Sequence, residues 1–266
     1  MNNFKQKFAD AKTAKKIVWI IFLIIAILIL VYTSYQLIKI FTPPKNPLAD
    51  YHEKPNGAVS EVPPKNPVDF AALKERNPDV CAWIYVPGSG DAYGTTIDYP
   101  ILQSGEDKVE DFYLKHDIDN KPLFDVSIYI QKANQMDFSD PNTIIYGHDL
   151  YNKTMFTPLR KYRNRKFFDE HPYIYIYTPG HILKYHIFST TLYNDNHLLY
   201  SYDFSNKEDY QKFLDETMDT SKKALLVRDG VTVTPNDKMI TLSTCTNNEH
   251  ERLLLIAVLI EDTQTQ

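Results

Sequence analysis

Two hydrophobic patterns follow one another along the chain. Near the N-terminus an uninterrupted apolar run extends over 17–31 and continues with milder residues to position 38, about the 20 residues that a helix needs to cross a bilayer. From Pro67 onward, apolar residues come in short runs separated by turn residues such as those at 87–90 and 179–180, which is typical of strands. The patterns predict one long apolar helix followed by a strand-rich domain.

Eight strands are expected in that domain, because runs rich in β-branched and aromatic residues recur along it. They cover 82–86, 97–102, 126–131, 143–147, 173–178, 181–193, 238–244 and 253–260. Helices are expected over 67–77, about 153–162, and 205–221, the last with Ser205 as its cap. The fold is therefore predicted to be mainly β, an antiparallel barrel or sandwich.

The same patterns divide the chain into four segments. Residues 1–16 form a basic tail, residues 17–38 a transmembrane anchor, residues 39–66 a linker and residues 67–266 one domain, which at roughly 200 residues is long enough to bury its own core. The linker is rich in proline and carries the pentapeptide PPKNP at 43–47, with a second copy at 63–67. Such a composition predicts an extended, semi-rigid spacer.

Charge beside the apolar run predicts the orientation of the chain in a membrane. The lysines of the tail precede the run, so the positive-inside rule leaves the N-terminus in the cytoplasm and the large domain outside the cell, on a single-pass anchor. A cleaved signal peptide is the alternative, but its apolar core is normally about 7 to 15 residues and ends at small residues. The residues after Val31 are bulky instead, which favours an uncleaved anchor.

Composition argues against several classes of protein. The net charge of −5 and the pI near 5.9 leave no basic stripe for phosphates, so no nucleic-acid partner is expected. The basic run at 160–166 is more typical of a solvated helix face than of a surface that contacts an anionic cell envelope. His250 has acidic neighbours but no second ligand at zinc spacing. Neither a metal nor another cofactor is expected.

The two cysteines lie in different surroundings. Cys81 belongs to the apolar run VCAWI, where a free cysteine behaves as a small buried hydrophobe. Cys245 ends the run TLSTC, and Arg252 begins the last apolar strand. Disulfides form in exported domains, so a disulfide between the two cysteines is an alternative to two free thiols. A domain of this size does not require one.

Cys245 is the candidate nucleophile. If its strand and the last strand are antiparallel neighbours, the thiol and the guanidinium of Arg252 lie side by side, and a nearby cation favours the reactive thiolate. His148 is the candidate base, because it follows a short strand and Gly147 and because histidine is the usual partner of an activated cysteine. A histidine in an ordinary surface loop is the alternative.

Several of these features, in their order along the chain, resemble the sortases, and among them class B. They are the anchor, the proline-rich stalk, the β-rich domain, GHD at 147–149 after a strand, TLSTC at a later strand end and arginine at the head of the last strand. The resemblance implies an eight-stranded sortase-type β-barrel with an N-terminal helix and a helix before the cysteine-bearing strand. It also implies that His148, Cys245 and Arg252 are catalytic.

The resemblance further implies the activity of a cysteine transpeptidase. Such an enzyme cleaves a C-terminal sorting pentapeptide of exported proteins through a thioacyl-enzyme and transfers the acyl group to an amine of a peptidoglycan precursor. Class B members tend to carry Asn-x-x-Tyr-Leu, which this chain matches at Tyr113 and Leu114 but not at Glu110. Leu114 is thus expected to line the peptide groove, while Ser243 and Thr246 are expected to hydrogen-bond the peptide.

Two other functions stay open on the sequence. A cysteine peptidase or amidase would use the same thiol, imidazole and guanidinium but would transfer the acyl group to water. A non-catalytic, membrane-anchored β-barrel that acts as an interaction module would need none of the three groups.

Overall fold

A computed structural model of the 266-residue chain describes residues 2–41, 48, 51–52, 64–90, 96–122 and 127–266. The chain falls into two units, Met1–Pro43 and Pro44–Gln266. Most of the linker expected over 39–66 lies outside the described residues, as does Val126, the first residue of one expected strand.

The first unit is a single long helix, α1 (Asn2–Phe41). Within it, the 21 residues from Val18 to Ile38 are predominantly apolar, and at 1.5 Å per residue they span about 30 Å, the thickness of the hydrocarbon core of a bilayer. Their side chains are exposed, Trp19 to 76%. The helix therefore has the length and composition of a membrane-spanning segment.

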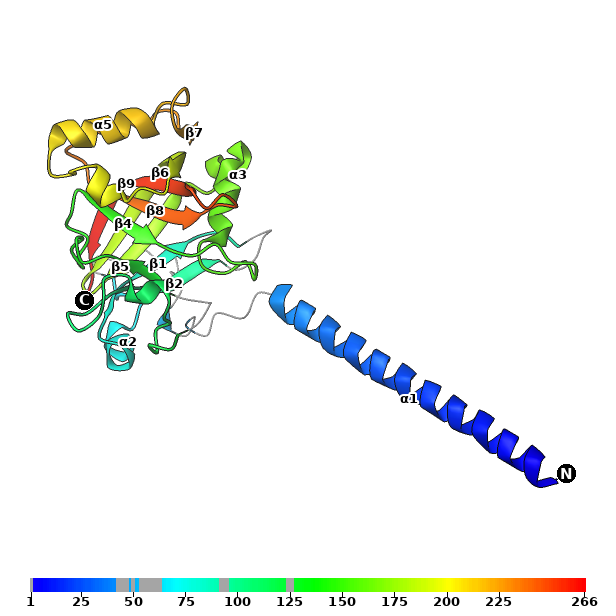
Figure 1. The fold of residues 1–266 in the computed structure, drawn as a ribbon. Coiled ribbons are helices and arrows are strands. Elements are labelled where there is room, and N and C mark those ends of the chain that lie inside the picture. Colours follow the sequence, from blue (N-terminus) through cyan, green and yellow to red (C-terminus); the bar gives the residue numbers. More distant parts are fainter. Residues whose placement is uncertain (1, 42–47, 49–50, 53–63, 91–95, 123–126) are drawn as a thin grey trace. The chain divides into compact units, whose positions relative to one another are not determined.

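The second unit is built on a closed barrel of eight strands, as the resemblance implied (Figure 1). Around the barrel, the strands follow the order β5 (Tyr173–Thr178), β1 (Val80–Val86), β2 (Ile97–Gln103), β3 (Ile128–Ile130), β4 (Asn142–Tyr146), β8 (Met239–Cys245), β9 (Glu251–Gln264) and β6 (His181–Asn194), and β6 pairs with β5 to close it. A further strand, β7 (Ala224–Val227), pairs with β6 outside the ring. The sequence did not predict β7, because four residues are too few to show the period of a strand.

Two pairs of strands are parallel, so the expectation of an antiparallel barrel is wrong. β2 pairs in parallel with β3, and β4 with β8. Parallel neighbours need a long connection that returns the chain to the same end, and residues 104–127 and 147–238 supply these connections. The second parallel pair brings the C-terminal ends of β4 and β8 to the same edge of the sheet.

Two helices lie where the sequence predicts them. α2 (Phe70–Arg76) begins after Asp69, whose side chain caps the helix by accepting a hydrogen bond from the Ala72 amide. α5 (Lys207–Thr217) precedes β8 but begins after Asn206, because the Asn206 side chain, and not that of Ser205, accepts hydrogen bonds from the first-turn amides. Both caps lie within two residues of the expected helix ends.

The helix expected over 153–162 is wrong. Lys153 and Met155 have positive φ angles of 63° and 54°, which a right-handed helix does not admit. The chain turns there and then forms the 3₁₀ helix η3 (Thr157–Arg163) and the short helix α3 (Arg165–Glu170). The short helices η2 (Phe112–Leu114) and α4 (Leu198–Ser201) were not expected.

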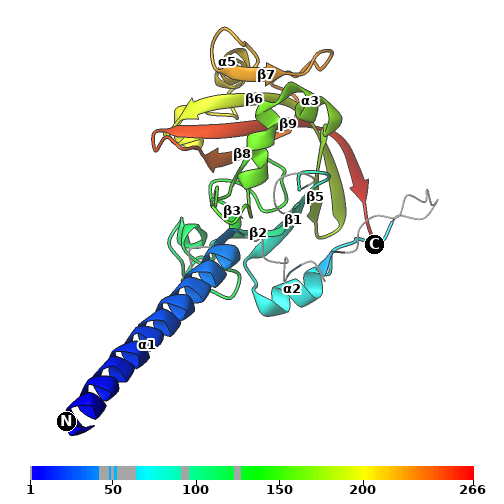
Figure 2. The same cartoon turned by 90° about the vertical axis from the view of Figure 1, so that its right-hand side faces the viewer.

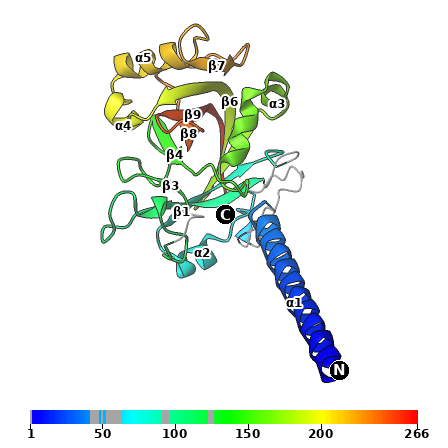
Figure 3. The ribbon, with the colours of Figure 1, turned by 45° about the vertical axis from the view of Figure 1, so that its right-hand side comes forward.

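The last strand is buried on both faces from Leu253 to Val258, as its sequence predicts. The odd-numbered residues of that stretch pack into the barrel core with Ile240 and Leu242 of β8, and the even-numbered ones pack with Tyr210 and Phe213 of α5. α5 and β7 lie on one side of the barrel, and α2 lies at the opposite end (Figure 2 and Figure 3). The strands that carry Cys245 and Arg252 are thus held from both sides.

Several described residues of the expected spacer contact the barrel. Leu48 and His52 are buried, and Tyr51 packs in the same cluster as Leu48. His52 Nδ1 lies 2.6 Å from a carboxylate oxygen of Asp98 in β2. The contacts of the second unit therefore begin before residue 67.

Candidate active site

Cys245 and Arg252 are direct partners across the antiparallel pair β8 and β9, as the sequence predicts. Cys245 is the one exposed residue of β8, because it ends a strand whose other residues are buried. Both cysteines are free thiols. Cys81 is buried in the barrel core, where burial raises the pKa of its thiol to about 12, so the accessible thiol is that of Cys245.

The parallel pairing of β4 and β8 brings His148 to the same edge. Tyr146 of β4 pairs with Ser243 of β8, and the Gly147 amide donates a hydrogen bond to the Ser243 carbonyl at 3.1 Å. His148 and Cys245 each follow this pair by two residues, so both lie at the same end of the two strands. Segments distant in the sequence thus meet at one strand end.

The ring of His148 is held by a main-chain oxygen. Its Nε2 lies 3.0 Å from the carbonyl oxygen of Leu114, and since a carbonyl only accepts, Nε2 carries the proton. Burial lowers the pKa of His148, and the Leu114 carbonyl opposes this by stabilising the charged ring. In the neutral form, Nδ1 is the nitrogen that can accept a proton.

Gly147 allows the Phe156 ring to pack directly against the backbone before His148. A Cβ atom at this position would lie 2.5 Å from the Phe156 ring, which is closer than real Cβ contacts come. The Phe156 amide in turn donates a hydrogen bond to the His148 carbonyl at 2.9 Å. The loop after β4 is therefore folded back against η3, and it holds His148 at a defined position.

The guanidinium of Arg252 is oriented by its own loop. Its Nη1 donates to the carbonyl oxygens of Glu249 and Glu251 at 2.9 and 3.1 Å. In the same loop, the Thr246 hydroxyl lies 3.1 Å from the Glu251 carboxylate, and the Thr246 amide donates to the Glu251 carbonyl at a long 3.3 Å. Arg252 is thus fixed at the strand end. A guanidinium has five N–H donors, so further donors remain for a ligand.

A pocket of about 240 Å³ opens beside the thiol, lined by Cys245, Thr246, Asn247, Asn248, Glu251, Leu253, Arg160 and Arg163. Arg160 Nε donates to the Asp149 carboxylate at 2.5 Å, and Arg160 Nη2 donates to the Asn247 side-chain oxygen at 2.7 Å. Burial raises the pKa of Asp149, and the Arg160 guanidinium opposes this. Arg160 therefore contacts the residue after His148 and the loop after Cys245.

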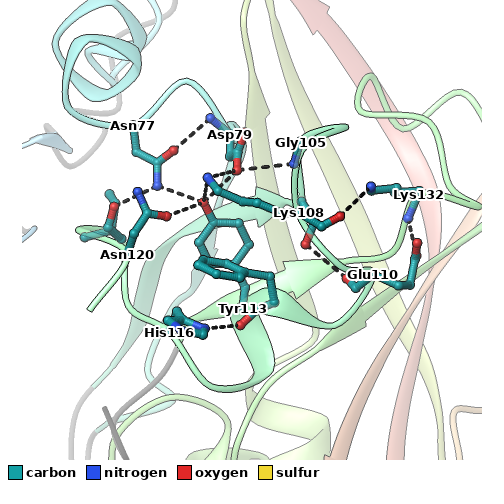
Figure 4. A network of polar contacts seen from close by, with 12 residues as sticks. Asn77, Asp79, Gly105, Lys108, Glu110, Tyr113, His116, Asn120 and Lys132 are labelled. Atoms are coloured by element: carbon teal, nitrogen blue, oxygen red, sulfur yellow. Dashed lines mark hydrogen bonds and ion pairs between the residues drawn. The ribbon is translucent and has the colours of Figure 1, made fainter. Parts of the chain in front are cut away.

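Leu114 belongs to a loop that a buried polar network fastens to the barrel (Figure 4). The Tyr113 hydroxyl donates to the Asp79 carboxylate at 2.7 Å and accepts hydrogen bonds from Lys108 and Asn77. Burial alone would raise the pKa of Asp79, but hydrogen bonds from Lys108 and Tyr113 outweigh burial and lower this pKa. The network thereby fixes the Leu114 carbonyl that meets His148.

Glu110, which stands where class B members tend to have asparagine, fastens the same loop. Its carboxylate accepts a hydrogen bond from the Lys132 amide at 2.6 Å, and the Lys132 ammonium donates to the Lys108 carbonyl (Figure 4). Glu110 is therefore tied to the chain segment that follows β3. In the structure, the hydrogen bond of the Glu110 carboxylate stabilises the loop to which Glu110 belongs.

Most of the second unit matches a known protein family. A profile of the sortase domain matches residues 91–260. The chain belongs to the sortase family. Sortase B of Staphylococcus aureus is 28% identical over 255 residues, which cover 93% of this chain and 98% of that protein. Sortase B of Listeria monocytogenes is 33% identical over 183 residues, which cover 68% of each chain.

Solved structures give the same class. The structure of Clostridium perfringens sortase B is 36% identical and has a TM-score of 0.62, covering 73% of this chain and 100% of that one. The chain is accordingly a class B sortase, and the enzymes of this class are cysteine transpeptidases. The sequence-based assignment to class B is confirmed.

Two residues near the thiol of this sortase were missed by sequence reasoning. Arg160 was counted in a solvated basic run, yet it is only half-exposed and paired with Asp149. Tyr129 of β3 is buried, and burial raises the pKa of its hydroxyl, with smaller contributions from the charges of Asp111 and Cys245. In the sequence, the feature that could have indicated a role for Arg160 was Asp149, an acidic residue directly after His148 that could pair with an arginine.

Proposed function

We propose that this sortase cleaves a C-terminal sorting pentapeptide of exported proteins and transfers the acyl group to an amine of a peptidoglycan precursor. The observation that supports this best is the meeting of three elements at one edge. β4 and β8 end at the same edge, where His148 follows β4 and Cys245 ends β8, and β9 pairs Arg252 with Cys245. A thiol, an imidazole and a guanidinium in this arrangement suit acyl transfer through a thioacyl-enzyme.

In the first step, the Cys245 thiolate attacks the carbonyl carbon of the scissile peptide bond. The negative charge that develops on the carbonyl oxygen is stabilised by Arg252 and by the Thr246 amide, and one such donor is typically worth about 3 to 4 kcal/mol. The Thr246 amide must first leave its long hydrogen bond to Glu251. His148, as imidazolium, gives its proton to the leaving amine, a role that commonly contributes about 10² to 10⁴-fold.

In the second step, an incoming amine attacks the thioacyl carbonyl. His148 takes a proton from that amine, the bond to sulfur breaks, and the Cys245 thiolate is restored. Leu114 beside His148, and Ser243 and Thr246 beside Cys245, are proposed to contact the bound peptide. A structure of S. aureus sortase B with a substrate and a structure of a sortase B with triglycine support a peptide donor and a peptide amine as the acceptor.

The membrane is the proposed location of the enzyme. α1 provides a segment of spanning length, Val18–Ile38, and lysines precede it. By the positive-inside rule, the N-terminus is cytoplasmic and the catalytic unit is extracellular. This orientation places the thiol on the side where exported proteins and wall precursors meet.

The test uses the full-length protein in detergent with a small library of sorting-like pentapeptides, with and without an amine donor. Mass spectrometry then distinguishes the amide product from the free acid. We expect cleavage at one position and an amide product when amine is present, and neither product with Cys245→Ala or His148→Ala. Free acid alone at every amine concentration would instead indicate a peptidase or amidase.

A further inference from the structure

We propose that Arg160 is a positioning residue, which ties the loop that carries His148 to the loop that follows Cys245. The proposal rests on the function proposed above, because it assigns Arg160 to the alignment of the same imidazole and thiol. Arg160 touches neither reacting group in the structure. It acts through Asp149 on one side and Asn247 on the other.

The two loops lack a strand-to-strand connection at this point. The pairing of β4 with β8 ends at Tyr146 and Ser243, extended only by the hydrogen bond from the Gly147 amide. His148 and Asn247 therefore lie beyond the last main-chain contact between the two segments. Arg160 is the side chain that donates hydrogen bonds to both loops among the described residues.

Arg160 itself sits on a fixed support. It belongs to η3, whose Leu159 and Tyr162 are fully buried in the barrel core. Asp149 is 5% exposed at its side chain, and Arg160 is 35% exposed. The ion pair is therefore partly shielded from water, where a charge-assisted hydrogen bond is stronger and more directional than on an open surface.

The planar fork of the guanidinium explains why arginine serves this purpose. Nε and Nη2 are fixed relative to each other, so one side chain holds an aspartate and an asparagine at a set separation. A lysine at this position offers a single ammonium that satisfies Asp149 but cannot hold both partners in that geometry. Without any cation, the buried Asp149 carboxylate is left unpaired beside His148.

The experiment compares Arg160→Gln, Arg160→Lys and Asn247→Ala in the full-length protein in detergent. Two quantities are measured: kcat and KM for transfer, and the rate at which iodoacetamide alkylates the enzyme as a function of pH. Alkylation reports Cys245, because Cys81 is buried and its thiol has a pKa of about 12. Arg165→Gln is the matched control, since Arg165 also pairs with an aspartate but lies on the exposed helix α3.

Misalignment of reacting groups lowers kcat more than it raises KM, and a displacement of about 1 Å can cost on the order of 100-fold. We expect Arg160→Gln to lower kcat roughly 10- to 100-fold with KM nearly unchanged. Its alkylation profile should shift toward that of His148→Ala. Arg160→Lys and Asn247→Ala should each show a smaller change in the same direction, and Arg165→Gln should show none.

Several outcomes would overturn the proposal. Wild-type kcat and alkylation profile in Arg160→Gln, while His148→Ala is inactive, would show that the imidazole does not need Arg160. If Arg160→Gln fails to fold, Asn247→Ala decides, because it removes only the exposed acceptor, and a wild-type profile there refutes the link. Activity that persists in His148→Ala would instead contradict the proposed function.

Discussion

The imidazole and the guanidinium of this site are each held by main-chain oxygens. His148 is held by the Leu114 carbonyl, and Arg252 by the carbonyls of Glu249 and Glu251. Such contacts depend on the path of the backbone and not on the identity of the residues that supply them. Two predictions concern these groups individually.

The first prediction concerns the guanidinium. Arg252→Lys should lower kcat/KM for transfer by roughly 10²-fold, because an ammonium lacks the planar fork and loses an oxyanion donor. Steady-state kinetics with a peptide and an amine measure the loss. Lys184→Arg, at the opposite end of the neighbouring strand β6, where Lys184 pairs with Glu261, is the control for exchanging lysine and arginine elsewhere in the protein. Most of the activity surviving in Arg252→Ala would remove Arg252 from the mechanism.

The second prediction concerns the titration of His148. Burial favours the neutral ring, so its pKa should lie below the ordinary value of 6.5. Protonation of His148 therefore occurs at lower pH than for an exposed histidine, and the imidazolium is a minor species at neutral pH. NMR titration of labelled histidines, assigned with His148→Ala, measures the midpoint. A midpoint at or above 6.5 would contradict the burial of the ring.

At the scale of elements, the loop between β2 and β3 supports the site from outside the barrel strands. Its polar network joins Asp79, Lys108 and Tyr113 near the end of α2 (Figure 4). The next residue, Leu114, contacts His148. The polar network thereby fixes the position of this loop, although the loop has no strand pairing to hold it. Stability and catalysis are expected to respond together when this network is broken.

Tyr113→Phe tests that connection. It removes a hydroxyl that donates to Asp79 and accepts from Asn77, and a buried group left unsatisfied costs about 1 to 3 kcal/mol. Urea unfolding should show that loss, and kcat should fall, because Leu114 shifts. Tyr151→Phe is the control, since Tyr151 is 89% exposed. A loss of stability with unchanged kcat would separate the loop from the site.

The same network sets a dependence of stability on pH. The folded pKa of Asp79 is lowered from 3.8, so its contribution is fully present above that value and is lost as pH falls through the folded pKa. The difference in unfolding free energy between the wild type and Asp79→Asn should therefore shrink in acid. An unchanged difference down to the lowest pH at which the protein stays folded would contradict the lowered pKa.

At the scale of the whole molecule, the apolar helix α1 and the barrel belong to separate units. The described hydrophobic clusters draw on residues from Leu48 onward and on none of α1. A protein that lacks residues 1–43 should therefore keep its unfolding midpoint and its transfer activity but lose its association with lipid vesicles. Flotation and urea unfolding measure the two properties. Flotation of the truncated protein with vesicles would show a second membrane contact.

Local patterns in the sequence were sufficient for much of this protein. The apolar helix, all eight barrel strands within four residues of their ends, and the facing of Cys245 and Arg252 followed from composition, strand period and a short loop. A short loop between antiparallel strands admits few geometries, so neighbours in sequence become neighbours in space.

Only the tertiary structure decided that His148 and Cys245 lie at the same end of neighbouring strands, since this depends on a parallel pairing of β4 and β8 across a long connection. The local pattern of a short strand followed by Gly147 and the resemblance both named His148, but no spacing in the sequence located it relative to Cys245. The attachment of Arg160 to Asp149 and Asn247, and of Leu114 to His148, likewise joins segments far apart in the chain. Such contacts depend on the closure and packing of the whole barrel. A local pattern of polar and apolar residues therefore does not predict them.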